Sequence, residues 1–345
     1  MKTEVLSTKN QTNLDLISTE KAVFKVKEIF QKNLSKNLNL FKVTAPIIVE
    51  NGRGINDDLN GIENPVAFYI KDLPQKKFEI VHSLAKWKRI KLAQLKLHAG
   101  EGIYVEMNAL RPDEKLSNIH SVFVDQWDWE KVITKEDRSV KFLKATVEKI
   151  YDTFKLTEEQ LTEEFKTFSK QLPDKVTFIY AEDLAKAFPE LTSKQREEVV
   201  AKKYKAVFIM GIGGKLFDGK KHDGRAPDYD DWSSLNEEGY FGLNGDLIFW
   251  NEILQIPFEV SSMGIRVDKY ALIHQLKLEG KLDRLDLAFH QKILNDELPL
   301  TIGGGIGQSR TCMFFLQKRH IGEVQSSVWP ESLINECKAN GINLL

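Results

Sequence analysis

The feature that most constrains the fold is the run Gly303-Gly-Gly-Ile-Gly-Gln-Ser-Arg310, in which four of the five residues from 303 to 307 are glycine. Glycines on a strand let a flat ligand approach the backbone closely, and the predicted helix that follows begins with a fixed cation. This arrangement predicts a seat for a nucleotide. A flexible turn ahead of a core helix is the alternative, because glycine-rich loops alone are weak support for a binding site.

The run fits neither of the common phosphate loops. A P-loop requires Gly-Lys followed by Ser or Thr, whereas Gly214-Lys215 is followed by Leu216. A dinucleotide-binding fingerprint requires a G-x-G-x-x-G between a strand and a helix, and residues 303–310 lack that spacing. The nucleotide would therefore be held in another way.

Two further groups of residues could contact a nucleotide. Arg111-Pro-Asp-Glu114 ends a predicted strand, and a guanidinium there suits bidentate contact with a phosphate, although such a turn is more often a solvated hairpin. Asp246 and Glu259 lie on adjacent predicted strands, where two carboxylates could hold Mg²⁺ while phosphates complete its shell. Either carboxylate could equally be a surface charge.

The predicted elements favour an α+β fold with a large antiparallel sheet flanked by helices, because hairpins and helical insertions join the strands instead of a regular βαβ alternation. We expect a loose segment over residues 1–18 and one domain over residues 19–345. Pro46 places the first strand at an edge or an interface. The first expected helix begins at Thr19. Further helices are expected over 82–97, 131–168, 193–204, 268–278 and 283–294. The glycine run is predicted as a turn over 303–307, and a last helix follows it and ends at Phe315. The expected strands cover 40–49, 66–70, 78–81, 102–111, 121–129, 176–180, 206–210, 246–250 and 258–265, and residues 215–231 form a long functional loop.

Two of these elements carry polar residues whose surroundings the pattern predicts. Alternation over residues 121–129 puts Val122, Val124, Gln126 and Asp128 on one face, which suggests a lined pocket. Lys88 lies in a predicted helix flanked by other basic residues, and its spacing alone favours a solvated lysine.

Composition excludes several classes of partner. Forty-nine Lys and Arg balance fifty Asp and Glu, so no electrostatic attraction to nucleic acid or to a membrane is expected. Two cysteines without CxxC spacing indicate a reducing compartment, and neither cysteines nor histidines have zinc-site spacing. The N-terminal residues are polar, and no apolar run approaches the roughly 18 residues of a membrane span. We expect a cytoplasmic protein.

Three segments of the chain resemble, in type and in order, the three motifs of class II aminoacyl-tRNA synthetases. In that family a long helix with a Pro-ended strand comes first, an Arg-bearing strand and loop second, and a glycine-rich strand with a final Arg third. Here these are residues 19–46, residues 111–114 and residues 303–310. The resemblance implies the catalytic core of that class.

Longer strings narrow the resemblance to ammonia-dependent asparagine synthetases, the aspartate-ammonia ligases related to class II synthetases. The resemblance covers nearly the whole chain. Its strings are His82-Ser-Leu-Ala-Lys-Trp-Lys-Arg89, Leu110-Arg-Pro-Asp-Glu114, His120-Ser-Val-Phe-Val-Asp-Gln-Trp-Asp-Trp129, Arg225-Ala-Pro-Asp-Tyr-Asp-Asp-Trp232, Ser261-Ser-Met-Gly-Ile-Arg266 and Thr301-Ile-Gly-Gly-Gly-Ile-Gly-Gln-Ser-Arg310.

The resemblance implies a homodimer that activates the side-chain carboxylate of L-aspartate with ATP and Mg²⁺, forms β-aspartyl-AMP and pyrophosphate, and lets ammonia displace AMP. It implies that Arg111 clamps the α-phosphate, that Arg310 and Gly305 contact the nucleotide, and that Asp246 and Glu259 are the metal-side carboxylates. The residues implied to surround the amino acid are Asp57, Lys88, Gln126, Asp128, Asp230, Ser261 and Ser262.

The chemistry of this reaction fits those residue types. A carboxylate that attacks a phosphate meets like-charge repulsion, which cations such as Lys88, Arg111 and Arg310 reduce. Amination requires free ammonia, so a general base would help, and Asp57 or Asp230 is our hypothesis for it. A glutamine-dependent enzyme would instead need a cysteine nucleophile, commonly at the mature N-terminus, whereas this sequence begins Met1-Lys-Thr.

Two other functions remain open at this point. One is a class II aminoacyl-tRNA synthetase or a core relative that passes its adenylate to tRNA, although no anticodon-binding module or basic stripe is evident. The other is a non-catalytic nucleotide-binding paralogue, which the joint presence of Arg111, Asp246, Glu259 and Arg310 argues against.

Overall fold

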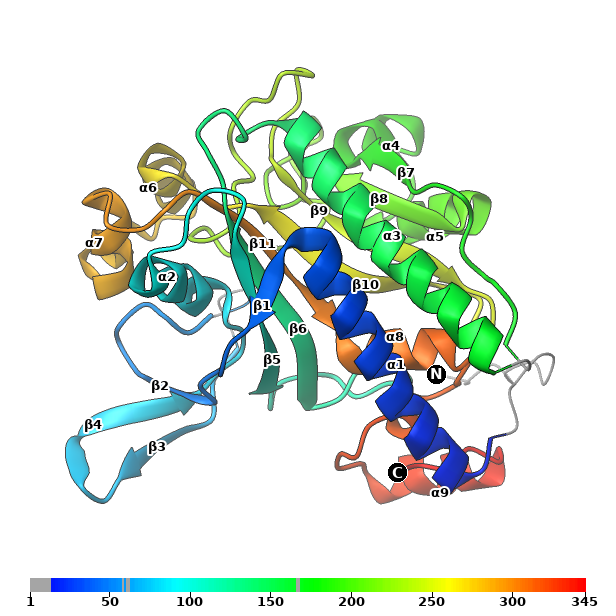
Figure 1. The fold of residues 1–345 in the computed structure, drawn as a ribbon. Coiled ribbons are helices and arrows are strands. Elements are labelled where there is room, and N and C mark those ends of the chain that lie inside the picture. Colours follow the sequence, from blue (N-terminus) through cyan, green and yellow to red (C-terminus); the bar gives the residue numbers. More distant parts are fainter. Residues whose placement is uncertain (1–13, 58, 60–62, 166–167) are drawn as a thin grey trace.

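The computed structural model describes residues 14–57, 59, 63–165 and 168–345, and within these residues eight strands form one large sheet (Figure 1). Five neighbouring pairs inside this sheet are antiparallel, and the β1–β5 and β7–β8 pairs at its two ends are parallel. The strands, in their order across the sheet, are β1 (Leu40–Lys42), β5 (Gly102–Leu110), β6 (Phe123–Val132), β11 (Thr301–Gly307), β10 (Ile256–Ile265), β9 (Asn244–Asn251), β8 (Ala206–Met210) and β7 (Thr177–Tyr180). The expected α+β class with a mainly antiparallel sheet is confirmed.

The prediction of one strand over residues 40–49 is wrong, because the structure has two strands there. Residues 40–49 divide into β1 in the large sheet and β2 (Ile48–Glu50) in a second sheet with β4 (Leu73–Ile80) and β3 (Ala67–Ile70). Pro46 lies between the two strands, where its missing N–H interrupts no ladder. The second sheet projects from the lower left of the molecule in Figure 1.

The main hydrophobic core lies between one face of the large sheet and the helices α1 (Leu16–Leu38), α3 (Val140–Glu164) and α8 (Gln308–Phe315). Helices α1 and α3 run side by side across this face (Figure 1). The rings of Phe30 and Trp127 stack with centroids 4.4 Å apart, and Phe154 meets Phe249 edge-on at 5.0 Å. Such pairs join the helices to the centre of the sheet.

The opposite face is covered only at its two ends. Helix α2 (Ala85–Leu95) packs on β5, β6 and β11, while α4 (Ala181–Ala187) and α5 (Ser193–Tyr204) pack over β7 to β10. Helices α6 (Lys269–Leu278) and α7 (Ala288–Leu294), joined by the short η1 (Leu282–Asp286), lie beside α2 (Figure 1). The middle of this face, above β6, β11, β10 and β9, is where polar residues collect.

The helix predictions differ from the structure at their ends. Helix α1 begins at Leu16, where Asp15 accepts the backbone N–H of Ser18 as N-cap, so residues 16–18 of the expected loose segment are helical. Residues 1–13 lie outside the described residues. The 303–307 turn is the strand β11, and α4, η2 (Ile321–Glu323) and α9 (Glu331–Ala339) were not predicted.

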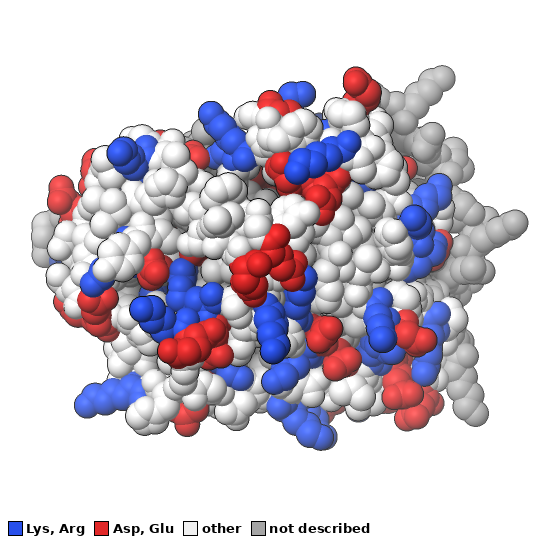
Figure 2. All heavy atoms as spheres, turned by 90° about the horizontal axis from the view of Figure 1, so that it is seen from above, with Lys and Arg blue, Asp and Glu red and all other residues white. Residues whose placement is uncertain are grey.

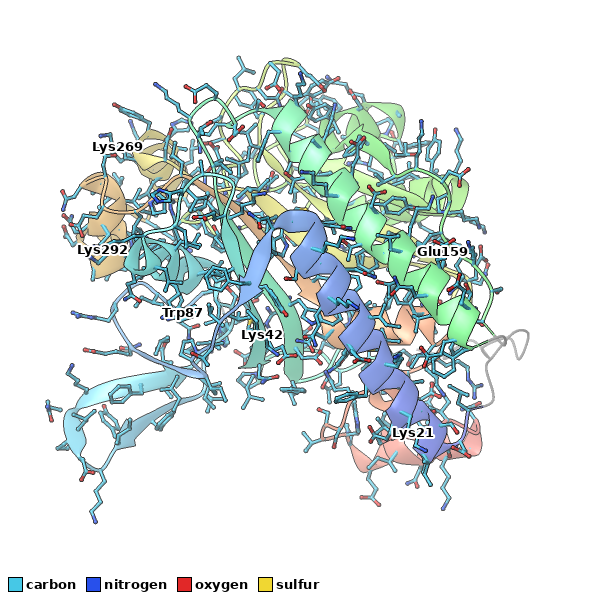
Figure 3. All side chains as sticks on the ribbon, in the orientation of Figure 1. Lys21, Lys42, Trp87, Glu159, Lys269 and Lys292 are labelled. Carbon is cyan, nitrogen blue, oxygen red and sulfur yellow. The ribbon has the colours of Figure 1, made fainter. Side chains whose placement is uncertain are left out.

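Helix α2 buries Lys86, Lys88 and Arg89 together with Ala85 and Leu92. Trp87 is only partly buried and projects toward the segment between β1 and β2 (Figure 3). Helix periodicity assigns charged residues to the solvent side, and it fails here because each cation has a buried acceptor.

Charges of both signs are interspersed over the described part of the face shown in Figure 2. This mixture of signs agrees with the formal net charge of −1. No helix among the described residues is long and apolar enough to span a membrane.

Candidate active site

A row of residues across the large sheet forms the floor of the site. The register aligns Asp128 on β6 with Gly305 on β11, then with Ser262 on β10 and Asp246 on β9. A Cβ on Gly305 would lie 2.4 Å from Oε1 of Gln126, so the glycine leaves a side-chain-free step between polar neighbours. The glycine run therefore makes a flat strip of backbone, as the nucleotide-seat prediction required.

Two adjoining cavities lie above this floor, with volumes of about 350 Å³ and about 210 Å³. Of the predicted site residues, the larger cavity is lined by Asp57, Arg111, Gln126, Asp128, Asp230, Glu259, Ser262 and Gly305. The smaller cavity shares Arg111, Gln126, Glu259 and Gly305 and adds Ser261 and Arg310. The lining, as far as the structure describes the chain, does not include Lys88 or Asp246.

Lys88 extends from α2, on the same face of the sheet as the cavities, and is fully buried. Its Nζ donates to Asp128 and to the carbonyl oxygen of Trp129 at 2.9 Å, and it lies 3.6 Å from Oε2 of Glu130. The solvated-lysine interpretation is therefore wrong. A buried cation between two carboxylates fixes the side chain of Asp128 at the cavity wall.

Arg111 and Asp57 are tied together through His82. Arg111 Nη2 donates to the carbonyl oxygen of His82 at 3.1 Å, and His82 Nδ1 lies 2.9 Å from the carbonyl oxygen of Asp57, to which it donates as the N–H tautomer. The Asp57 carboxylate accepts the backbone N–H of Leu59 at 3.0 Å. Burial raises the pKa of Asp57, and the charge of Lys86 opposes this shift. His82 therefore links the backbone of Asp57 to the guanidinium of Arg111.

Asp230 belongs to a second buried charge cluster on the same side of the sheet. Arg266 donates to Asp230 through Nη1 and to the Glu130 carboxylate through Nε at 3.0 Å and Nη2 at 2.8 Å. Burial raises the pKa of Asp230, with Arg266 acting in the opposite direction. A Cβ on Gly303 would lie 1.9 Å from Glu130 Oε2, so this glycine makes room for the cluster.

Asp246 and Glu259 are diagonal neighbours on one face of the sheet, because Glu259 pairs with Ile248, two residues along β9 from Asp246. Burial raises the pKa of Asp246 to about 6, Arg225 opposes the shift, and the charge of Glu259 adds to it. Arg225 Nη2 donates to Asp246 Oδ1 and to Ser262 Oγ at 3.0 Å. Two carboxylates at this spacing attract a cation.

Arg310, on the first turn of α8, donates through Nη1 to the carbonyl oxygen of Glu259 at 2.9 Å and lines the smaller cavity. Ser261 Oγ donates to the carbonyl oxygen of Gly305 at 2.9 Å. His120 lies nearby, and burial together with the Arg310 charge lowers its pKa to about 4. His120 is therefore neutral at physiological pH.

The sequence did not single out three cavity residues, Arg225, Tyr229 and Arg266. All three lie within the strings 225–232 and 261–266 that carried the family resemblance. Spacing offered no further signal, because a basic or phenolic side chain in a loop is usually solvated. The ion pairs with Glu130, Asp230 and Asp246 reveal Arg225 and Arg266, and the Arg266 guanidinium lies over the ring of Tyr229 at 5.6 Å.

Comparison with known proteins gives consistent results. The aspartate-ammonia ligase family matches residues 17–341. Aspartate-ammonia ligases of Bacteroides fragilis and Bacteroides thetaiotaomicron are 56% and 55% identical over 332 residues, which cover 96% of this chain and 96% of each relative. The corresponding ligase of Clostridium perfringens is 53% identical over the same share.

Solved structures with a similar fold include asparaginyl-tRNA and aspartyl-tRNA synthetases. The Pyrococcus horikoshii enzyme, complexed with asparaginyl-adenylate, has a TM-score of 0.65 at 15% identity and covers 90% of this chain and 70% of its own. The Entamoeba histolytica enzyme, with the same type of ligand, has a TM-score of 0.64 at 14% identity and covers 90% and 66%. At these identities the likeness concerns the fold, which is that of class II synthetases. The match over residues 17–341 and the full-length relatives show that the chain belongs to the aspartate-ammonia ligase family.

Proposed function

We propose that this chain makes L-asparagine from L-aspartate and ammonia in an ATP-dependent reaction that passes through β-aspartyl-AMP and releases pyrophosphate and AMP. The observation that carries the proposal is the pair of adjoining cavities above the glycine strand. Arg111 borders both of them, and Asp57, Asp128 and Asp230 line the larger one. A nucleotide and an amino acid can therefore meet at Arg111.

The smaller cavity suits the nucleotide. Arg310 and Arg111 provide two guanidinium groups along its wall, and Gly305 provides a flat floor. During adenylation the β-carboxylate of aspartate attacks the α-phosphate, so charge builds up where two anions meet. Preorganised guanidinium groups lower this barrier because they are already oriented toward the developing charge.

Mg²⁺ fits the donors that the site offers. Asp246 and Glu259 present carboxylate oxygens on one face of the sheet, and the described residues contain no cluster of three or more His, Cys, Asp or Glu that could hold a metal by itself. Mg²⁺ is commonly held by one or two carboxylates together with substrate phosphates and water. When bound, it would neutralise charge on the polyphosphate.

The larger cavity suits aspartate. Asp57, Asp128 and Asp230 offer partners for the substrate ammonium group, and Gln126 and Ser262 offer neutral hydrogen bonds. Arg266 is a cation at the cavity wall and can face a substrate carboxylate. Lys88 then acts as a positioning residue, because its buried ammonium group is held by Asp128 and Glu130.

Ammonia is the proposed nitrogen source. Burial raises the pKa of Cys312 to about 12, so this thiol is not ionised at neutral pH and cannot open a glutamine amide. Asp57 or Asp230 would take the proton from ammonium, and the raised pKa of each suits a proton acceptor.

The assembly is proposed to be a homodimer in the cytoplasm. Phe24 on α1 is 76% exposed, and Phe41 on β1 and Ile48 on β2 are also exposed. Phe24 and Phe41 lie within residues 19–46, the segment that resembles the first motif of class II synthetases, and Ile48 follows this segment closely. Apolar side chains in such number on adjoining elements favour an interface.

The test is to incubate the purified chain with ATP, Mg²⁺, aspartate and ammonium, and to quantify AMP, pyrophosphate and asparagine. Over many turnovers all three should form in equal amounts, and asparagine and AMP should form only with ammonium. ADP as product, or asparagine formation without ammonium dependence, would contradict the proposal. Salt-dependent binding of tRNA with transfer of the amino acid would favour a synthetase, and no turnover with intact ATP binding would favour a non-catalytic paralogue.

A further inference from the structure

Arg225 forms an ion pair with Asp246, the carboxylate that the proposed metal would need. Its Nη2 donates to Asp246 Oδ1 and, at 3.0 Å, to Ser262 Oγ, and its Nη1 donates to the carbonyl oxygen of Gly224 at 2.8 Å. The side chain is only 12% exposed. In this structure the guanidinium therefore supplies the positive charge beside Asp246.

A dication and this guanidinium do not fit beside Asp246 together. If the metal took Oδ1, it would replace Arg225 directly. If it took the other oxygen, two cations would lie on either side of one buried carboxylate, where like charges repel strongly because little water screens them. Metal binding must therefore move the guanidinium away from Asp246.

The surroundings of Arg225 let its side chain move while its backbone stays in place. The carbonyl oxygens of Ala226 and Pro227 accept hydrogen bonds from Trp232 Nε1 at 3.2 Å and from Gln275 Nε2 at 3.0 Å. Arg225 Nε, by contrast, is buried and has no hydrogen-bond partner among the described residues. An unused donor beside the cavity is available to an incoming anion.

We propose that Arg225 is a further catalytic residue of the adenylation step: it neutralises Asp246 in the substrate-free chain, releases this carboxylate to the metal when ATP enters, and turns its guanidinium to the polyphosphate. Arg225 lines the larger cavity together with Arg111 and Glu259, so the polyphosphate is within the same space. This inference rests on the proposed role of Asp246 and Glu259 as metal-side carboxylates.

The replacement of Arg225 by the metal at Asp246 predicts that loss of Arg225 strengthens metal binding but slows adenylation. Without Arg225, the metal meets no competitor at Asp246, so Arg225→Gln should bind Mn²⁺ about tenfold more tightly than the unchanged chain, as expected for the loss of one charge-assisted contact. The same variant should lose about 10²-fold in aspartate-dependent ATP–pyrophosphate exchange, the usual effect of removing one preorganised donor. A variant that merely unfolds the loop would weaken both.

The experiment measures free Mn²⁺ by electron paramagnetic resonance at pH 8 without nucleotide, and pyrophosphate exchange in parallel. Asp246→Asn should weaken Mn²⁺ binding both alone and combined with Arg225→Gln. Arg225→Lys keeps the positive charge and should bind Mn²⁺ like the unchanged chain while its exchange stays slow. Lys221→Gln is the matched control from the same loop, since Lys221 pairs with Glu279 at 2.7 Å outside both cavities, and both of its readouts should be unchanged.

Unchanged or weaker Mn²⁺ binding by Arg225→Gln, with weaker binding by Asp246→Asn, would overturn the replacement of Arg225 by the metal. Normal pyrophosphate exchange by Arg225→Gln would overturn the catalytic role, and Mn²⁺ binding that is insensitive to Asp246→Asn would overturn the inference at its base. Failure of the proposed function shows up separately, as absence of aspartate-dependent pyrophosphate exchange in the unchanged chain. Circular dichroism spectra establish that each variant is folded.

Discussion

Gly303 and Gly305 lie on the same face of β11, yet a methyl group at each would meet a different kind of neighbour. At Gly303 it would lie 1.9 Å from the Glu130 carboxylate, which is buried and paired with Arg266. At Gly305 it would lie 2.4 Å from the amide oxygen at the end of the Gln126 side chain, which can rotate away.

We expect Gly303→Ala to lower the free energy of unfolding by about 3 to 5 kcal/mol, since it separates a buried ion pair. Gly305→Ala should change stability by no more than about 1 kcal/mol but reduce kcat/KM for aspartate about tenfold or more, because Gln126 leaves the cavity wall. Urea unfolding and steady-state kinetics check both. Gly214→Ala is the control, because its Cβ would make only ordinary contacts, the nearest at 3.5 Å; equal effects of the three substitutions would contradict this account.

Asp57 and Asp230 give the site a pH dependence of predictable sign. Burial raises the pKa of each above the ordinary value of 3.8. A carboxylate accepts a proton only when it is ionised, so the amination rate should fall as pH drops through the raised pKa. Pre-formed adenylate mixed with saturating ammonium, at the same ammonium concentration for every pH, measures this limb in a rapid-quench instrument.

The Asn variants identify which carboxylate is the base. Asp57→Asn or Asp230→Asn should spare pyrophosphate release, slow amination about 10²-fold and remove the acid limb. Hydroxylamine, which is largely unprotonated at neutral pH, should restore much of the rate because it needs no base. If both variants aminate normally at saturating ammonium, the hypothesis is wrong.

At the scale of elements, α2 shows what local patterns miss. Its buried positions include Lys86, Lys88 and Arg89, whose partners Asp228, Asp128 and the carbonyl oxygen of Val267 come from distant parts of the chain. A helical pattern contains no information about such partners. The burial of Lys88 could therefore not be predicted, although the family resemblance placed the residue in the site.

We expect Lys88→Met to destabilise the chain by about 3 to 5 kcal/mol at neutral pH, since it leaves Asp128 and Glu130 buried beside each other without their cation. Thermal unfolding measures the loss. Lys91→Met, on the same helix but partly exposed, should cost less than about 1 kcal/mol. A melting temperature of Lys88→Met equal to that of the control would show that the two carboxylates do not need this charge.

Strands could be predicted where apolar and polar residues alternate clearly. They could not be predicted where pairing with a neighbouring strand determines the structure. Residues 102–110 of β5 and 206–210 of β8 matched the prediction closely. The 303–307 segment of β11 did not, because glycine disfavours strands and only close approach to β6 and β10 explains its run. The break between β1 and β2 was missed for a similar reason, since alternation does not say to which sheet a residue belongs.

At the scale of the whole molecule, the resemblance carried most of the functional prediction. The reaction and the eight predicted residues that line the larger cavity came from the family resemblance, whereas the α+β class came from the pattern of elements. The charge clusters around Arg225 and Arg266 were not, because they depend on contacts between segments far apart in sequence.

The proposed homodimer gives a prediction at this scale. Light scattering should report a mass twice 39.6 kDa, and Phe24→Glu should shift it toward the monomer, because a buried charge at an apolar interface costs several kcal/mol. Phe217→Glu is the matched control, since Phe217 is 57% exposed on the loop after β8. A monomeric mass for the unchanged chain, or equal behaviour of the two variants, would contradict the interface.

The position of β11 has a consequence for biosynthesis. This strand is the last one made as the chain grows, yet it lies between β6 and β10, in the interior of the large sheet (Figure 1). A nascent chain that has completed β10 therefore holds two half-sheets with open edges facing each other, and such edges invite mispairing. The glycine strand that seats the nucleotide also joins the two halves, so the chain cannot form its binding floor before synthesis of the sheet is complete.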